Sequence, residues 1–370
     1  MSAPAVRRLD CDLLRVLSML GVVYLHTASG ALRQSIGPLW HFSNLVTSLA
    51  TAAVPLFFML SGALLLNQPQ TASLHTLFRR RLPKLLVPLL AWSALVLLLM
   101  AAMGSPQAAL EQFTSILGTP VLTPYWFLYA LIVMYLLSPL LRELTVRLSD
   151  RHWDYMMLLW FVFVLLLNTL RDLAPAGPWK TAFTVSTVSN LSFVGGYLGY
   201  FPLGAWLARK RPPSRPVLWA AAAVSYAVIA VGTWRATLAA GAYSEVYKSY
   251  LHIFCAVLAC ALFQLARSYA EHRQSGRVIT ALSGLSFGIY LVHPLAIEFW
   301  QKVWTRFITP AVDTIPIQLG YYLAILLSSL AGIWVLTSIK PLCWVFTGQK
   351  FSAACRECNL FALLRRKEPS

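Results

Sequence analysis

Long apolar runs, separated by short polar connections, recur along the whole chain of 370 residues. A helix needs roughly 20 predominantly apolar residues to cross about 30 Å of hydrocarbon. Ten segments meet this requirement, at residues 13–32, 45–66, 84–103, 122–141, 155–171, 190–208, 217–235, 248–268, 281–300 and 319–339. They predict an all-α, polytopic integral membrane protein, a bundle of about ten transmembrane helices. We expect residues 1–345 to form the transmembrane domain and residues 346–370 a short basic tail.

The composition excludes the common soluble classes. Apolar residues make up 58% of the chain and charged residues only 12%, whereas soluble domains are about half apolar and a quarter charged. These figures exclude a soluble globule, a disordered chain, a disulfide scaffold and a coiled coil. The six cysteines are scattered. The single C-x-x-C motif, Cys355 and Cys358, lacks the second ligand pair that a zinc site needs, so we expect no metal.

The charges are asymmetric as well as few, since 30 Lys and Arg against 13 Asp and Glu give a net charge of +17. In a soluble protein this excess indicates nucleic-acid binding, but in membrane proteins basic residues gather in cytoplasmic loops. The predicted spans leave 22 basic residues on the side of the N-terminus and 7 on the other, with Arg15 inside the first span. The seven are Arg33, Arg171, Lys180, Arg235, Lys248, Lys302 and Arg306. We therefore expect two cytoplasmic termini, contact with membrane lipids and no nucleic-acid partner.

Two ionisable residues interrupt the first predicted span, which favours a retained helix over a cleaved signal peptide. Such residues cost several kcal/mol in a membrane helix unless they face a cavity or a partner. Arg15 and His26 are eleven residues apart, so they share a helix face within about 20° and lie roughly 16 Å apart along the axis. This spacing predicts a functional face. The alternatives are that Arg15 extends to the lipid headgroups and that His26 bonds a neighbouring helix.

A second polar stripe occurs in the ninth predicted span. Ser286, Tyr290 and His293 follow the spacing i, i+4, i+7, which places them on one helix face. His26 and His293 are each about 18–20 Å from the inner boundary of their spans. Two histidines at one depth predict a shared polar pocket, unless each is bonded separately within its own surroundings.

Three further segments have both a structural and a functional interpretation. The basic cluster from Arg79 to Lys84 marks topology and lipid contact, or binds a phosphorylated cytosolic cofactor. Ser61, at the end of the second span, lies in a stretch of small residues that allows close helix packing. The aromatic run from Tyr125 to Phe127 is typical of an interfacial belt, or of a platform for a sugar ring.

Together these segments resemble the membrane-bound acyltransferase 3 family. The resemblance rests on five motifs in order over about 280 residues: Asp12-Leu-Leu-Arg15 with His26, Val54 to Gly62, Arg81-Leu-Pro-Lys84 with Pro88, Tyr125 to Leu128 with Tyr135 and Ser138-Pro139, and Ser286 to His293. Within the family, the chain looks most like the stand-alone O-acetyltransferases that modify enterobacterial common antigen. It departs at Lys84, where the family has the second arginine of an R-x-x-R pair.

The resemblance implies a bacterial inner-membrane enzyme that moves acetyl groups from cytoplasmic acetyl-CoA to hydroxyls of extracytoplasmic glycans or lipid-linked sugars. On this basis we expect Arg80, Arg81 and Lys84, together with Arg15, to hold the phosphates of acetyl-CoA. The thioester is then expected to enter the bundle near Ser61.

The same resemblance assigns the chemistry of acceptor activation. His26 is expected to act as general base on the acceptor hydroxyl, or as a transient acyl carrier. Tyr290 and His293 are expected to orient that base or to stabilise the oxyanion, and Trp126 to stack on the acceptor sugar.

Two other functions compete with this hypothesis. One is a secondary transporter or flippase for a lipid-linked sugar or small molecule, and the other is a membrane sensor. A coupled carrier is disfavoured because no carboxylate lies near the middle of a predicted span; Asp12 and Glu298 are both near span ends. The acceptor, the choice between acetyl, succinyl and longer acyl groups, and the oligomeric state stay open.

Overall fold

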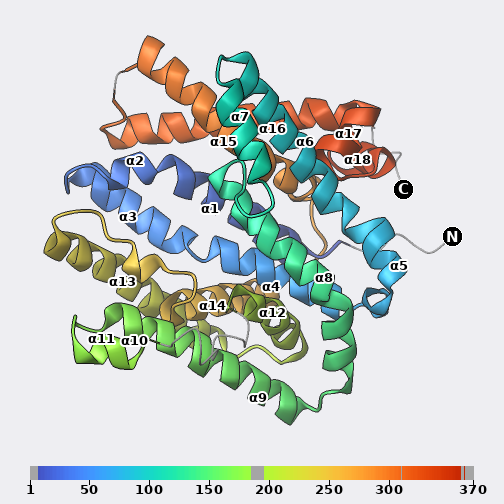
Figure 1. The fold of residues 1–370 in the computed structure, drawn as a ribbon. Coiled ribbons are helices and arrows are strands. Elements are labelled where there is room, and N and C mark those ends of the chain that lie inside the picture. The colour runs from blue at the N-terminus through green and yellow to red at the C-terminus, as the bar shows by residue number, and fades with distance from the viewer. Residues whose placement is uncertain (1–6, 185–195, 310, 360–361, 363–370) are drawn as a thin grey trace.

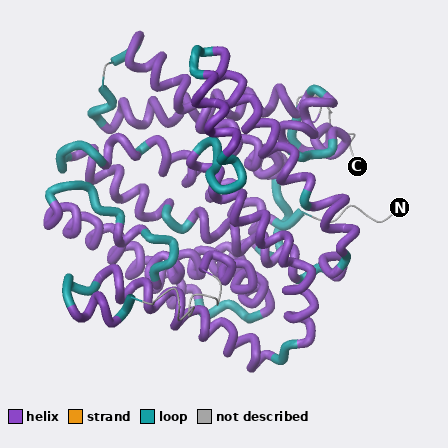
Figure 2. Tube along the Cα trace, in the orientation of Figure 1, coloured by secondary structure: helices purple, strands orange, loops and turns teal. Residues whose placement is uncertain are grey.

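The computed structural model describes residues 7–184, 196–309, 311–359 and 362. Within these residues the chain is helical, and it contains no β-strand, only one isolated backbone bridge between Arg8 and Gln274. Figure 2 shows helices linked by short loops. The predicted all-α class is therefore confirmed.

The α-helices, in chain order, are α1 (Leu9–Thr27), α2 (Ser29–Leu32), α3 (Pro38–Ala50), α4 (Ala53–Leu66), α5 (Leu74–Thr76), α6 (Pro83–Ala102), α7 (Pro106–Thr114), α8 (Trp126–Arg147), α9 (Asp150–Trp160), α10 (Leu167–Leu173), α11 (Pro178–Ala182), α12 (Tyr200–Arg209), α13 (Arg215–Ala240), α14 (Ile253–Ala270), α15 (Arg277–Phe307), α16 (Ile315–Ser338), α17 (Lys340–Thr347) and α18 (Phe351–Glu357). Short 3-10 turns occur at Pro69–Ala72, Thr123–Tyr125, Gly196–Gly199 and Val246–Lys248, and π-helical turns at Leu77–Arg81 and Phe161–Leu166. Proline occupies one of the first two positions of α3, α6, α13 and α16, where its fixed φ suits a helix start.

Eight helical segments in the described part of the chain are long and apolar enough to cross a membrane. They are Pro38–Leu66, Leu74–Ala102, Thr123–Arg147, Asp150–Leu173, Arg215–Ala240, Val246–Ala270, Arg277–Phe307 and Ile315–Ser338. Each overlaps one of the ten predicted spans, so the protein is a multi-pass membrane protein.

The two other predicted spans differ for separate reasons. The first corresponds to α1, which has 19 residues but carries Asp10, Asp12 and Arg15 near its start. Because of these three charges, composition alone does not mark α1 as a membrane span. The sixth, residues 190–208, lies partly outside the described residues, and its described part contains α12. The count of ten therefore stays a prediction.

Helix α1 lies inside the bundle and contacts α3, α4, α14, α15 and α16 (Figure 1). The ends of the described chain meet on one side, because Arg7 and Glu357 form an ion pair with a nitrogen–oxygen distance of 2.9 Å. The number of membrane crossings between them stays a prediction. Which side faces the cytoplasm stays a prediction from the charge distribution.

Helices α4 and α12 approach each other backbone to backbone. A Cβ atom at Gly62 would overlap the carbonyl group of Phe201, and one at Gly204 would overlap the carbonyl group of Met59. Small residues let transmembrane helices pack this closely. The contact fixes Ser61, next to Gly62, at one position in the bundle.

We predict that Gly62→Ala and Gly204→Ala each destabilise the protein by about 3 kcal/mol, because overpacking must push α4 and α12 apart. Thermal unfolding in detergent measures the effect. Gly332→Ala is the matched control. It also replaces a glycine inside a helix, α16, but a Cβ atom there meets nothing within 4 Å. An unchanged melting temperature for Gly62→Ala and Gly204→Ala would contradict the close contact.

Candidate functional site

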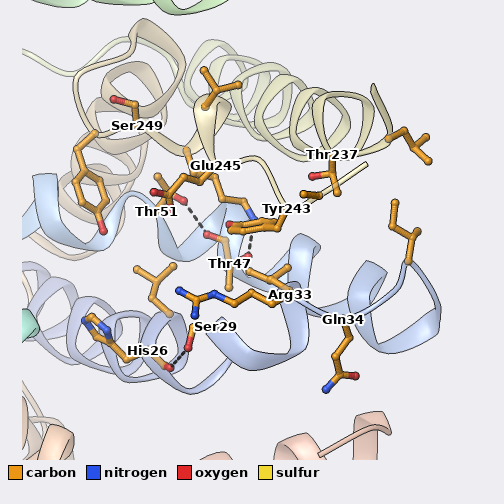
Figure 3. A pocket seen from close by; sticks show the side chains of 18 of the residues that line it. His26, Ser29, Arg33, Gln34, Thr47, Thr51, Thr237, Tyr243, Glu245 and Ser249 are labelled. Atoms are coloured by element: carbon orange, nitrogen blue, oxygen red, sulfur yellow. Dashed lines mark hydrogen bonds between the residues drawn. The ribbon is translucent and has the colours of Figure 1, made fainter. Parts of the chain in front are cut away.

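Two cavities lie toward opposite ends of α1. The Arg15 cavity, of about 650 Å³, is lined by α1, α4, α6, α8, α15 and residues 347–357. The His26 cavity, of about 1320 Å³, is lined by the end of α1, by α2 and the following loop, and by residues 237–250 (Figure 3). Four of the predicted site residues line the first cavity: Arg15, Ser61, Lys84 and Tyr290. His26 lines the second.

Arg15 is held in place by the buried carboxylate of Asp12. Arg15 Nη1 lies 3.4 Å from Asp12 Oδ1, and Ser275 and Ser283 each donate a hydroxyl hydrogen bond of 2.6 Å to the same carboxylate. Arg7 Nε lies 3.5 Å from it as well. Arg15 therefore lines the cavity beside a fixed partner, which is different from an arginine extended to the headgroups. The role of Asp12 is an addition to the residues predicted from the sequence, and its position three residues before Arg15 is the sequence signal for this pair.

The predicted basic cluster divides into members that face the cavity and members that do not. Lys84 lines the Arg15 cavity. Arg81 donates to Thr71 Oγ1 at 2.6 Å and to Gln68 Oε1 at 3.2 Å, and so braces the turn that precedes α5. Arg80 is exposed and does not line the cavity.

His26 and His293 lie next to each other, with ring centroids 5.3 Å apart. His293 is fully buried, and its Nδ1 lies 2.6 Å from the carbonyl oxygen of Tyr290. A carbonyl accepts hydrogen bonds only, so Nδ1 carries the proton and Nε2 has a free lone pair. His293 Nε2 has no hydrogen-bond partner among the described residues. His26 is half-buried, on the wall of its cavity.

Tyr290 links the two cavities, because it lines the Arg15 cavity while its ring centroid lies 5.6 Å from that of His293. Its hydroxyl donates to the carbonyl oxygen of Pro124. Tyr125 makes a parallel bond of 2.8 Å to the carbonyl oxygen of Leu291. These two bonds hold α15 against the start of α8.

The wall of the His26 cavity contains a buried cation, Lys248, which the sequence pattern indicates only as one of the seven basic residues opposite the N-terminal side. Lys248 is 9% exposed and donates to Thr47 Oγ1 at 2.7 Å, and its Nζ lies 5.6 Å from the centroid of the Tyr243 ring. Figure 3 shows Arg33 and Glu245 reaching into the same space.

A fixed carboxylate also lines this cavity. Asp172 accepts a hydrogen bond of 2.7 Å from Arg171 Nε, and its other oxygen lies 2.9 Å from Nε2 of the buried His252. No sequence pattern indicates this pair, because the two residues are 80 positions apart.

Trp126 lies behind the cavity wall rather than on it. Its ring is stacked on Tyr250 with centroids 5.9 Å apart and lies 5.3 Å from the ring of Tyr197. Tyr197 and Tyr250 line the His26 cavity, and Trp126 does not. The aromatic surface that faces the cavity therefore includes these two tyrosines and Tyr243, but not Trp126.

No group of three or more His, Cys, Asp or Glu side chains in the described ranges is arranged to hold a metal ion. The tail cysteine Cys358 donates instead to Gln349 Oε1, at 3.4 Å. Burial raises the pKa of the Cys358 thiol to about 12, so the thiol stays protonated at neutral pH.

The described helices form a multi-pass membrane protein with two cavities, one basic and one polar. A pair of histidines lies between the cavities, an arrangement typical of an enzyme site. The family model described as an acyltransferase domain matches residues 8–338, and the chain belongs to this acyltransferase 3 family. It is therefore a membrane acyltransferase, which requires an acyl donor and an acceptor. Comparison with curated proteins found no match. Comparison with solved structures found none either.

We predict that Asp12→Ala destabilises the protein by about 3 kcal/mol or more, because it leaves Arg15 and two serine hydroxyls without their buried acceptor. Glu143→Ala is the control, since Glu143 pairs with Arg147 at 3.7 Å on the exposed surface. We expect the control to cost at most about 1 kcal/mol. Equal melting temperatures for the two variants would show that the Asp12 network contributes no more than a surface ion pair.

Proposed function

We propose that this acyltransferase moves an acetyl group from cytoplasmic acetyl-CoA to a hydroxyl of an extracytoplasmic glycan or lipid-linked sugar, in the bacterial inner membrane. The observation that carries the proposal is the contact series Tyr290, His293 and His26, which leads from one cavity to the other. A donor in the first cavity and an acceptor in the second then meet at two imidazoles.

The Arg15 cavity suits the polyanionic donor. Arg7, Arg15, Lys84 and Lys350 line it, against a single acid, Glu357, that is already paired with Arg7. Guanidinium groups match phosphate geometry, and ammonium groups supply point charges. We assign this cavity to the cytoplasmic side, an assignment that the predicted excess of basic residues on that side supports.

Arg80 and Arg81 extend the positive charge beside this cavity. Arg81 lies three residues before Lys84 in the chain, and the exposed Arg80 is the neighbour of Arg81. We assign both to the phosphates of the donor outside the cavity. The thioester then passes Ser61 toward Tyr290, since both side chains line the same space.

His26 is the general base in this mechanism. It takes the proton from the acceptor hydroxyl as the oxygen attacks the thioester carbonyl, forming the ester C–O bond. The C–S bond then breaks, and the coenzyme A thiolate leaves and receives the proton from His26. We assign His293 to orient the base: its Nδ1 is bonded to the Tyr290 carbonyl oxygen, and its ring lies 5.3 Å from that of His26. An acyl group carried on His26 is the alternative that the same geometry permits.

The His26 cavity has the character of a saccharide site. Tyr197, Tyr243 and Tyr250 offer aromatic faces on which sugar rings stack, and Ser29, Thr47 and Thr237 add hydroxyl groups. Trp126 supports Tyr197 and Tyr250 from behind, so its contribution to acceptor binding passes through them.

The direct test supplies radiolabelled acetyl-CoA to membranes that contain the protein and asks which envelope glycan or lipid gains the label. We expect a labelled extracytoplasmic sugar whose label is released by mild base, as an O-ester is. Export of an unmodified sugar, with no label transferred, would support a carrier instead.

We predict that His26→Ala lowers acetyl transfer at least 100-fold, because general-base catalysis typically contributes 10²–10⁴-fold. Binding of coenzyme A, measured by calorimetry, should stay at the wild-type level, since His26 does not line the Arg15 cavity. His272→Ala, which removes an exposed histidine, is the control. Wild-type turnover in His26→Ala would overturn the assignment of the base.

Tyr290→Phe separates the two roles considered for Tyr290. Its hydroxyl is bonded to the Pro124 carbonyl, so we expect a positioning residue and less than a tenfold fall in kcat. A hydroxyl that stabilised the oxyanion would cost about 10²–10³-fold. Tyr125→Phe is the matched control, because it removes the parallel bond to Leu291 without contacting His293. Its loss of stability should be similar, about 1 kcal/mol.

A further inference from the structure

The segment Lys340–Glu357 lies beyond the residues matched by the family model, which end at 338, and yet it forms part of the Arg15 cavity. It folds back as α17 and α18. Six of its residues line the cavity: Thr347, Gly348, Gln349, Lys350, Ala353 and Glu357. The predicted basic tail thus contributes one wall of the proposed donor site.

The turn between α17 and α18 is packed tightly on α6. Trp92 Nε1 donates to the Phe346 carbonyl oxygen at 3.0 Å, and the two rings lie 5.0 Å apart. Gly348 has a φ of +65°, and a Cβ atom there would overlap the carbonyl oxygen of Lys84. A glycine at this position allows both the left-handed backbone and the close approach. The next two residues are thereby set beside Lys84.

Two further bonds tie α18 to the rest of the bundle. Gln349 Nε2 donates to the carbonyl oxygen of Gly284 in α15. Arg7 Nη1 bonds Glu357 Oε2 at 2.9 Å. The segment is thus fixed from both sides, and its side chains keep defined positions around the cavity.

Lys350 places a second ammonium group near Lys84. Both residues line the cavity, and Gly348, two residues before Lys350, lies against the backbone of Lys84. Glu357, the one acid on this cavity wall, is engaged by Arg7. Two neighbouring cations without their own acid repel each other, and a phosphate bound between them converts that repulsion into attraction.

We propose that Lys350 binds a phosphate group of the acyl donor together with Lys84, so that the segment Lys340–Glu357 is part of the donor site. The inference rests on the proposed function for the identity of the donor. It also accounts for Lys84, which stands where the resembling family has an arginine. A single ammonium group lacks the bidentate fork of a guanidinium, and a second lysine from outside the matched domain supplies the further hydrogen-bond donors.

Coenzyme A binding to the purified full-length protein in phosphatidylcholine nanodiscs tests the proposal. We expect Lys350→Gln to raise the Kd for coenzyme A about tenfold, the effect of one lost charge-assisted bond, and to reduce its salt dependence. Lys350→Arg should bind within about twofold of wild type, since it keeps the charge. Arg356→Gln is the matched control: it removes one positive charge from an exposed position of α18 that does not line the cavity.

The outcomes separate the two proposals. If wild type binds coenzyme A and Lys350→Gln binds it equally well, the role of Lys350 is wrong and the proposed function stands. If wild type does not bind coenzyme A, the donor assignment fails, and this inference fails with it. A further measurement uses nanodiscs that contain phosphatidylglycerol. If Lys350→Gln no longer binds this lipid but still binds coenzyme A as wild type does, Lys350 contacts lipid headgroups and the proposal is overturned.

Discussion

The hydrogen bond between Asp12 and Ser283 sets the register of α1 against α15, and the proposed chemistry depends on that register. The bond is 2.6 Å long and joins the first turn of α1 to the second turn of α15, and the two helices remain in contact further along. At the far end of the same contact, the rings of His26 and His293 lie 5.3 Å apart. A slip of one residue on either helix would rotate its histidine by about 100° and separate the rings. One buried carboxylate therefore positions Arg15 beside it and the histidine pair more than three turns away.

The same pair of helices explains why the ionisable groups are tolerated in the bundle. Each charge near the start of α1 has a fixed partner: Asp10 bonds Arg8 at 2.6 Å, and Asp12 neighbours Arg15 and Arg7. The histidines further along have no such charged partners, and a neutral imidazole needs none. Charge is thus concentrated at one end of α1, where a polyanion is proposed to bind, and the histidine proposed as the base lies at the other end. In this proposal, donor binding and proton transfer are separated along one helix.

The sequence predicted most of what depends on helical periodicity and little of what depends on contacts between distant segments. Arg15, His26, Tyr290 and His293 were found because polar side chains are rare in apolar spans, and equal depth indicated that the histidines meet. Spacing within one helix says nothing of Asp172 and His252, whose pairing arises only when α10 packs beside the start of α14. The predictions for Trp126 and for the tail missed contacts of the same kind. The sequence does not show which neighbour an aromatic ring or a lysine side chain faces, because that depends on how distant segments pack.

The layer between the two cavities bears on the choice between an acyltransferase and a carrier. Phe58 is stacked on Phe127 at 4.5 Å, and Phe127 contacts Tyr290 at 5.6 Å, so aromatic rings fill this layer from the side of α4 and α8. The backbone carbonyls of Pro124 and Tyr290 hold Tyr290 and His293 within it. A carrier must open such a layer wide enough for a whole sugar to pass. An acyl transfer needs only the acyl group, rather than a whole sugar, to pass between the cavities. An aromatic layer with a histidine pair at its edge therefore favours group transfer, because it closes the path to a whole sugar and leaves the two imidazoles where donor and acceptor are proposed to meet.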